Sequence, residues 1–102
     1  MGYVAPSITT NPPDSGTVYQ NTLPYDIRLK IPVTYSPTST AAATLATGIN
    51  TTGTVTTSTK VSIPAGVTTG EILTYEMIVP AGFYYEIVVA NATIGTVEVQ
   101  AA

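Results

Sequence analysis

Six carboxylates are the side chains of this sequence best suited to acid–base chemistry. They are Asp14, Asp26, Glu71, Glu76, Glu86 and Glu98. Two carboxylates that flank a glycosidic bond can hydrolyse it, one as the acid and the other as base or nucleophile. Glu76 and Glu86 are the best candidates for such a pair, because both fall on the outer face of the hairpin expected below. Two solvated strand residues explain the same pattern, and we favour that interpretation.

The sequence contains no His and no Cys. Without them it has neither a Ser–His nor a Cys–His nucleophile pair. Zinc sites are also built mostly from these two residue types. The sequence has neither a Gly-rich phosphate loop nor the acidic spacing of a calcium loop. We therefore expect a protein that is not an enzyme and that uses no cofactor and no metal.

The charge content is low for a chain of 102 residues: 9% of the residues are charged and the net charge is -3. The basic residues are Arg28, Lys30 and Lys60. Nucleic-acid binding needs clustered Lys and Arg, so we expect no nucleic-acid partner. No apolar run approaches the length of about 18 residues that spans a membrane, so we expect no membrane partner. A surface with so few charges favours association with other protein chains.

Tyrosine is the commonest aromatic residue, with seven copies. Tyr84 is the best candidate for an exposed aromatic side chain, because it points away from Phe83 and Tyr85 in an extended strand. It is expected to face a protein partner in preference to a sugar ring. Glu86 lies on the same face of that strand. Tyr84 and Glu86 are therefore candidate partner-binding residues.

The clearest strand runs from Asp26 to Tyr35. Apolar and polar residues alternate along it with a period of two, as in a strand with one buried face. The residues expected to face the core are Ile27, Leu29, Ile31, Val33 and Tyr35. Pro32 cannot donate a ladder hydrogen bond, so this strand is expected to be an edge strand or to be bulged at that point.

Glu71–Val89 is expected to form a β-hairpin around the turn Pro80-Ala81-Gly82. Proline suits the start of such a turn, and Gly82 is expected to have a positive φ. Pro64-Ala65-Gly66 repeats the same turn chemistry. The residues expected to be buried together are Leu29, Ile31, Tyr75, Met77, Phe83, Tyr85 and Ile87.

The remaining strands are expected at 17–20, 41–49, 54–63 and 96–100, with a turn over 91–95. The small residues of 41–49 would let another backbone approach closely. Seven or eight short strands with turn signals every 8–12 residues or so are typical of β-sandwiches. The fold class expected is all-β: an antiparallel β-sandwich, jelly-roll or immunoglobulin-like.

Residues 1–16 are expected to form an extended arm in front of a sandwich domain at 17–102. Three prolines in the arm deny it regular structure. Its apolar side chains, Tyr3, Val4 and Ile8, are candidate partner-binding residues. Because the sandwich has enough strands to close its own core, we expect the arm to contact another chain.

Several segments resemble one known group of proteins. They are Tyr19-Gln20-Asn21-Thr22, the strand Ile27–Tyr35 with the following Ser-Pro-Thr, Ala41–Leu45, Val79-Pro80-Ala81-Gly82-Phe83-Tyr84-Tyr85, and Thr93–Val97. Together they resemble small structural proteins encoded in the virion modules of tailed bacteriophages. Those proteins are β-sandwiches that decorate capsids or form head or tail fibres. The resemblance covers Val18–Gln100 and leaves the arm outside.

The resemblance implies a capsid decoration (cement) protein on the outer surface of the virion. Its partners would be the major capsid protein and sister copies of itself, with a homotrimer suggested by the three-fold sites of capsid lattices. Many small contacts would act together to hold the shell. The alternative is a receptor-binding or carbohydrate-binding module of a tail or head fibre.

Overall fold

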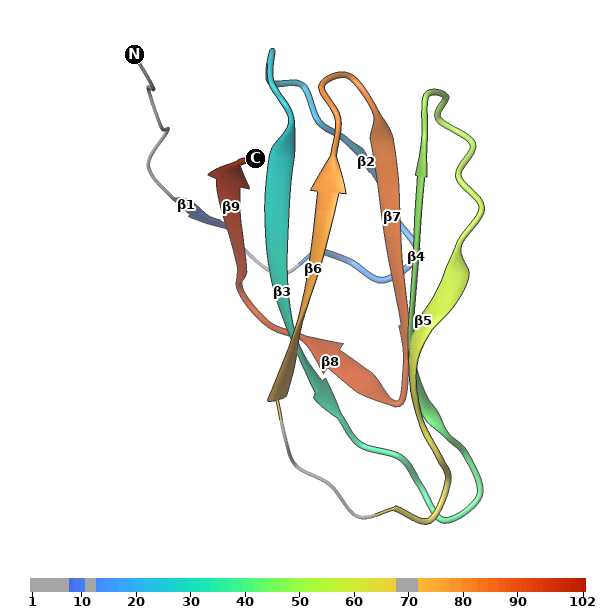
Figure 1. Ribbon diagram of the computed structural model, residues 1–102. Coiled ribbons are helices and arrows are strands. Elements are labelled where there is room, and N and C mark those ends of the chain that lie inside the picture. Colours follow the sequence, from blue (N-terminus) through green and yellow to red (C-terminus); the bar gives the residue numbers. More distant parts are fainter. Residues whose placement is uncertain (1–7, 11–12, 68–71) are drawn as a thin grey trace.

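The computed structural model describes residues 8–10, 13–67 and 72–102, with residues 8–10 described by their backbone alone. These residues form nine strands and no helix (Figure 1). The strands are β1 (Ile8–Thr10), β2 (Val18–Gln20), β3 (Ile27–Tyr35), β4 (Ala43–Asn50), β5 (Ser58–Ile63), β6 (Ile72–Val79), β7 (Tyr84–Ala90), β8 (Ala92–Ile94) and β9 (Val97–Ala101). Two of them were not expected: β1 lies in the predicted arm, and β8 in the predicted turn over 91–95.

The strands form two antiparallel sheets. Sheet A has the order β1-β9-β3-β6, with β8 also paired to β3, and sheet B has the order β2-β7-β4-β5. Buried residues from both sheets form one apolar cluster. The chain is therefore all-β, and the two-sheet arrangement matches the predicted β-sandwich.

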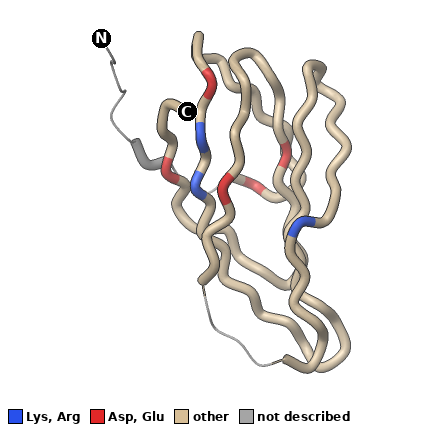
Figure 2. The backbone as a smooth tube through the Cα atoms, viewed as in Figure 1, with Lys and Arg blue, Asp and Glu red and all other residues tan. Residues whose placement is uncertain are grey.

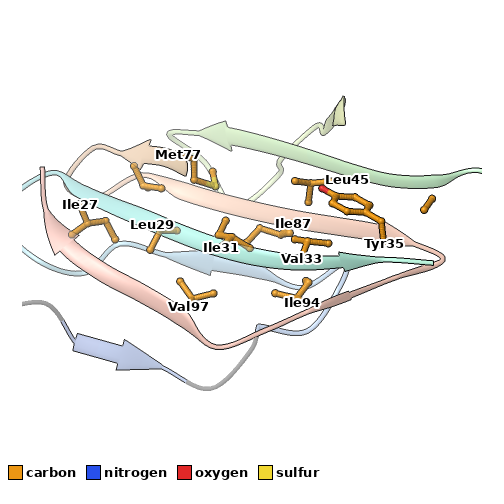
Figure 3. Packing of buried hydrophobic residues seen from close by; sticks show 12 residues of the cluster. Ile27, Leu29, Ile31, Val33, Tyr35, Leu45, Met77, Ile87, Ile94 and Val97 are labelled. Atoms are coloured by element: carbon orange, nitrogen blue, oxygen red, sulfur yellow. The ribbon is translucent and has the colours of Figure 1, made fainter. Parts of the chain in front are cut away.

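β3 provides the largest share of the core. Its burial alternates without a break, so that every second residue from Ile27 to Tyr35 is buried. Figure 3 shows these side chains in a row along β3. Leu45 and Ile87 of sheet B belong to the same cluster. The predicted faces of β3 are confirmed, because one apolar residue in every two suits a strand with one covered face.

The predicted core is also largely confirmed. Leu29, Ile31, Met77 and Ile87 are buried. The three aromatic residues of the predicted set are partly buried and pack against the same cluster: Tyr75, Phe83 and Tyr85.

The predicted hairpin is wrong, because β6 and β7 belong to different sheets. β6 pairs with β3, whereas β7 pairs with β2 and β4. Phe83 N donates to Pro80 O at 3.0 Å and Gly82 has φ 81, so the predicted turn forms with its positive-φ glycine. The turn carries the chain from one sheet to the other, because two strands with apolar inner faces can bury them against each other across the core.

The prediction that the strand around Pro32 is an edge strand is also wrong. β3 lies between β6 on one side and β9 and β8 on the other. The irregularity lies in the neighbouring strand, which is broken between Ile94 and Val97. Gly95 N donates to Pro32 O at 2.7 Å, and a Cβ at Gly95 would lie 3.1 Å from Pro32 Cγ. The backbone nitrogen of Pro32, which carries no hydrogen, therefore faces the break, where the ladder has no hydrogen bond for it to donate.

Asn21 holds the chain where it passes from sheet B to sheet A. The residue is 2% exposed, and its Nδ2 donates to Val79 O and to Tyr25 O, each at 3.0 Å. Its Oδ1 accepts from Leu23 N at 3.1 Å. Its backbone O accepts from Gly82 N at 2.9 Å. The buried side-chain amide thus ties the β2–β3 connection to the end of β6, and the backbone of Asn21 ties it to the β6–β7 turn.

Gly48 of β4 lies under the segment that leads into β5. A Cβ at this position would lie 2.8 Å from the carbonyl carbon of Thr56 and 2.9 Å from Val55 Cγ1. Asn50 Nδ2 donates to Thr54 O at 2.9 Å and so fixes the same segment. The expectation that small residues in 41–49 allow a close backbone approach is therefore confirmed at Gly48.

Gly48→Ala is expected to lower the free energy of unfolding by about 1–3 kcal/mol, because residues 54–57 must move away from the added methyl group. Urea unfolding followed by circular dichroism would measure the loss. The matched control is Gly53→Ala, where a Cβ would meet nothing within 4 Å. An equal loss of unfolding free energy in both variants would mean that the close approach at Gly48 does not affect stability.

Tyr35 carries a buried hydroxyl. The residue is 1% exposed, and its Oη has no hydrogen-bond partner among the described residues. Burial disfavours the phenolate and raises the pKa of Tyr35 above its usual range. In the unfolded chain the pKa of this hydroxyl has its ordinary value of about 10. Stability from Tyr35 is therefore present below about pH 10 and is lost as the pH rises through the folded-state pKa.

Tyr35→Phe is expected to leave the stability near pH 7 unchanged or to raise it by up to about 1 kcal/mol, because the hydroxyl is desolvated without a partner. The fall in melting temperature between about pH 9 and about pH 11 should be smaller than in the wild type. Calorimetry at both pH values would measure the two effects. A clear loss of stability at neutral pH would show that the hydroxyl makes a stabilising bond.

Candidate interaction surfaces

Three of the five predicted site residues lie in the described part of the chain, in two separate regions. Tyr3 and Val4 lie outside the described residues. Ile8 lies in β1, opposite Val99 of β9. Residues 8–10 of the predicted arm are thus joined to sheet A through their backbone. That the arm contacts another chain stays a prediction.

Tyr84 and Glu86 lie on β7, in the middle of sheet B. Tyr84 has Gln20 of β2 on one side and Asn50 of β4 on the other. Glu86 is flanked by Val18 and Gly48 in the same way. Both predicted site residues are partly buried. The segment that crosses Gly48 lies beside Glu86 and leaves less of this face open than the sequence suggests.

The amides beside Tyr84 are used to hold turns. Gln20 Nε2 donates to Gly82 O at 3.1 Å. Asn50 Nδ2 donates to Thr54 O, and its Oδ1 accepts from Thr51 N at 2.6 Å. Tyr84 therefore sits in a row of polar side chains whose positions are fixed by the neighbouring turns.

A second surface is the connection between β2 and β3, residues 21–26, called here the 21–26 loop. It exposes two large side chains, Leu23 at 37% and Tyr25 at 39%. The loop is fixed at one end by the buried amide of Asn21, and at the other by Asp26 Oδ1, which accepts from Ala81 N at 3.0 Å. An apolar loop that is already fixed loses little conformational freedom when it binds.

Leu23 and Tyr25 are candidate interaction residues that were not predicted from the sequence. The available signal was their position: two large side chains on either side of a turn proline, in a segment that the alternation pattern leaves outside every strand. Turn residues are usually small or polar, so apolar residues there suggest a contact.

The third surface is β6, one of the two end strands of sheet A. Ile72 is 63% exposed, Ile78 is 48% exposed and Leu73 is 42% exposed. This surface was not predicted, because the expected hairpin placed β7 next to β6. With β7 in the other sheet, one side of β6 has no paired strand among the described residues.

Charged residues lie on the neighbouring strands β3, β6 and β9 of sheet A (Figure 2). Arg28 Nε lies 3.8 Å from Glu76 Oε1, and Lys30 Nζ lies 3.7 Å from Glu98 Oε1. All four side chains are well exposed, so each pair stabilises the fold by about 1 kcal/mol at most. Glu76 and Glu86 lie in different sheets, which excludes the alternative of a carboxylate pair on one hairpin face.

Tyr19 and Tyr85 form the one ring stack found in the described part of the chain. Their centroids are 5.7 Å apart and their planes differ by 26°. The pKa of Tyr85 is raised mainly by burial and to a smaller extent by the neighbouring Tyr19. Both rings are opposite each other in the β2–β7 pairing, so the stack fastens the short strand β2 to sheet B.

The described residues bring no three His, Cys, Asp or Glu side chains together as a metal-binding group. They also form no helix that is long and apolar enough to cross a membrane. Comparison with models of known protein families, with curated proteins and with solved structures gives no match.

Proposed function

We propose that this chain is a non-enzymatic structural protein of a bacteriophage virion, a decoration protein that binds the outer surface of the capsid. The sequence resemblance over Val18–Gln100 suggests this class, and a small β-sandwich suits it. The observation that carries the proposal is the 21–26 loop, which presents Leu23 and Tyr25 in fixed, exposed positions. Its natural partner is an apolar depression on the major capsid protein.

Binding by this loop would be weak in a single copy, since two side chains bury little area. Tyrosine and other aromatic residues nevertheless contribute strongly where they fill a pocket. On a shell, many copies bind at once, and contacts between sister copies add to those with the capsid. The combined strength exceeds that of each contact. A decoration protein can therefore stabilise a shell through modest individual interfaces.

Purified protein added to capsids that lack it should attach to their surface in many copies, and electron microscopy would show the added density. The double variant Leu23→Ser/Tyr25→Ser should attach at least about tenfold more weakly, because the apolar contact is lost. Circular dichroism would check that this variant keeps its fold.

The matched control is Val67→Ser, which changes a side chain that is 44% exposed in the Pro64–Val67 turn. This turn lies at the opposite end of the sandwich from the 21–26 loop (Figure 1). The control should attach like the wild type. Failure of the wild-type protein to bind any capsid would contradict the proposal, and unchanged binding of the double variant would move the contact away from the loop.

The arm can be tested separately. A chain that lacks residues 2–7 keeps β1 and loses Tyr3 and Val4. If the arm holds a neighbour, this variant should attach more weakly while its melting temperature stays the same. Unchanged attachment would limit the interface to the sandwich domain.

A second candidate function, glycan binding by a fibre module, is favoured by the row Gln20–Tyr84–Asn50 on sheet B. An aromatic ring between amides is a common arrangement for a sugar, with stacking on the ring and hydrogen bonds to the hydroxyls. Saturation-transfer NMR with cell-surface polysaccharides would detect such binding. Tyr84→Ala should abolish the signal and Tyr25→Ala should not. A particle carrying only a few copies at fibre tips would favour this function over decoration.

A further inference from the structure

Among the described residues, five strands have an unpaired side, and four of them are protected against pairing with another chain. β1, β2 and β8 have only three described residues each. β5 is bulged, because the register shifts between Leu45 and Ala46 and leaves Lys60 without an opposite residue. Short edges, bulges and lysine are the usual devices that stop edge-to-edge association.

β6 has none of these devices. It has eight residues, Ile72–Val79, and all eight are paired with β3 in one unbroken register. It contains neither Lys nor Arg nor Pro, and Glu76 is its one charged residue. A long, regular edge strand with exposed apolar side chains is a template for pairing with another strand.

The direction of the backbone groups on β6 follows from the bonds of β3. Asp26 O accepts from Ala102 N, and Pro32 O accepts from Gly95 N. Even-numbered residues at β3 therefore direct their backbone groups toward β9 and β8, and odd-numbered residues direct theirs toward β6. Because odd-numbered residues of β3 lie opposite odd-numbered residues of β6, the even-numbered residues of β6 direct their N–H and C=O groups to the free edge.

We propose that β6 pairs with β6 of a second copy, antiparallel, across a two-fold axis at Tyr75. In this register Ile72 lies opposite Ile78 of the second copy, Leu73 opposite Met77, and Thr74 opposite Glu76. The even-numbered residues exchange backbone hydrogen bonds, as their direction requires. The pairing covers the exposed Ile72, Ile78 and Leu73 and joins the two copies of sheet A into one continuous sheet.

Neighbouring registers that keep the same faces together are less favourable. An axis at Glu76 places the two Glu76 side chains opposite each other, and like charges in that position are destabilising. An axis at Thr74 places Ile72 opposite Glu76, and an axis at Met77 places Ile78 opposite Glu76. Of these four axes, the one at Tyr75 places apolar side chains opposite apolar side chains. It also keeps the two Glu76 carboxylates from lying directly opposite each other.

This dimer is independent of capsid binding and uses a different surface from the 21–26 loop. A contact of this kind uses the same strand in both partners and closes on itself, so it makes dimers. The homotrimer implied by the resemblance would have to use another surface.

Native mass spectrometry and analytical ultracentrifugation of the full chain are the first test. The wild-type protein should show a monomer–dimer equilibrium. Position 74 then tests the register, since it faces Glu76 of the second copy. Thr74→Glu should weaken the dimer about fivefold or more, and Thr74→Lys should strengthen it, because each substitution acts twice across the axis. Val18→Lys on β2 is the control and should leave the equilibrium unchanged.

Disulfide trapping tests the same register by geometry, since the chain has no cysteine of its own. Residues that exchange hydrogen bonds in an antiparallel pair have Cα atoms about 5.5 Å apart, which suits a disulfide. An oxidised mixture of Thr74→Cys and Glu76→Cys proteins should give the mixed dimer in excess over either dimer of one variant.

Three results would overturn the proposal. The wild type could remain monomeric at every concentration. Thr74→Glu and Thr74→Lys could change the dimer in the same direction, or the cysteine mixture could give no excess of mixed dimer. Loss of the dimer on removal of residues 2–7 would instead identify the arm of a second copy as the occupant of this edge. None of these results depends on whether the protein binds capsids.

Discussion

Asn21→Leu should lower the free energy of unfolding by about 2–4 kcal/mol. The side chain is buried and makes three hydrogen bonds, to Val79 O, Tyr25 O and Leu23 N. Leucine has a similar size but satisfies none of these groups, and a buried polar group left without a partner costs about 1–3 kcal/mol. Val79 O, in the buried bond, contributes most of the loss. Urea unfolding monitored by circular dichroism would measure it.

Thr22→Leu is the matched control, since residue 22 is exposed and takes no part in this network. It is expected to change stability by less than about 0.5 kcal/mol. If Asn21→Leu also stays within that range, then water replaces the lost bonds and the amide does not hold the two sheets together at this end.

Leu29→Ala is the second substitution with a large expected effect. Leu29 is 2% exposed and lies in the middle of sheet A, opposite Met77 on one side and Val99 on the other. Removing its side chain leaves a cavity between neighbours that are held in two ladders, so collapse is limited. We expect a loss of about 2–5 kcal/mol. In a domain of this size that corresponds to a fall in melting temperature of roughly 10 °C or more.

Leu73→Ala makes the same chemical change on the inner side of β6, where the residue is 42% exposed. In the monomer its expected loss is below about 1 kcal/mol, because much of the side chain is in water while β6 is unpaired. Similar losses at both positions would mean that burial in this structure does not determine stability.

The strand faces could be predicted from the sequence because they depend on local order alone. A period of two along β3 assigns Ile27–Tyr35 to two faces whatever strands lie beside it. The Pro80-Ala81-Gly82 turn was predictable for the same reason, because glycine tolerates the positive φ that the turn requires.

The pairing of strands could not be predicted in this way. The same turn residues serve a hairpin within one sheet and a crossing between two, so the local pattern gave β6 the wrong neighbour. The prediction of an edge strand around Pro32 was wrong for a related reason. The break that accommodates Pro32 lies between β8 and β9, more than sixty residues later in the chain. Burial of Asn21 also depends on distant backbone, since its partner Val79 is 58 positions away.

The candidate interaction surfaces likewise combine local features, which could be predicted, with tertiary features, which could not. Tyr84 lies on the face opposite the core, as expected, but the segment that crosses Gly48 beside Glu86 is a tertiary feature. The free edge of β6 was missed entirely, because an edge strand is defined by the strand that is absent beside it. Tyr3 and Val4 lie outside the described residues, so their predicted role still rests on the sequence alone.

The order in which the strands pair constrains how the chain folds during synthesis. Of the first three strands, β1 pairs with β9, β2 pairs with β7, and β3 pairs with β6, β8 and β9. Each of them can therefore pair only after a segment from the second half of the chain has been synthesised. The ribosome therefore releases β3, with its row of apolar side chains, long before its partners emerge. Structures dominated by such non-local pairs fold slowly. We expect native sheet A to form only after translation of β9 is complete, which makes the nascent chain a natural client for chaperones that bind extended apolar segments.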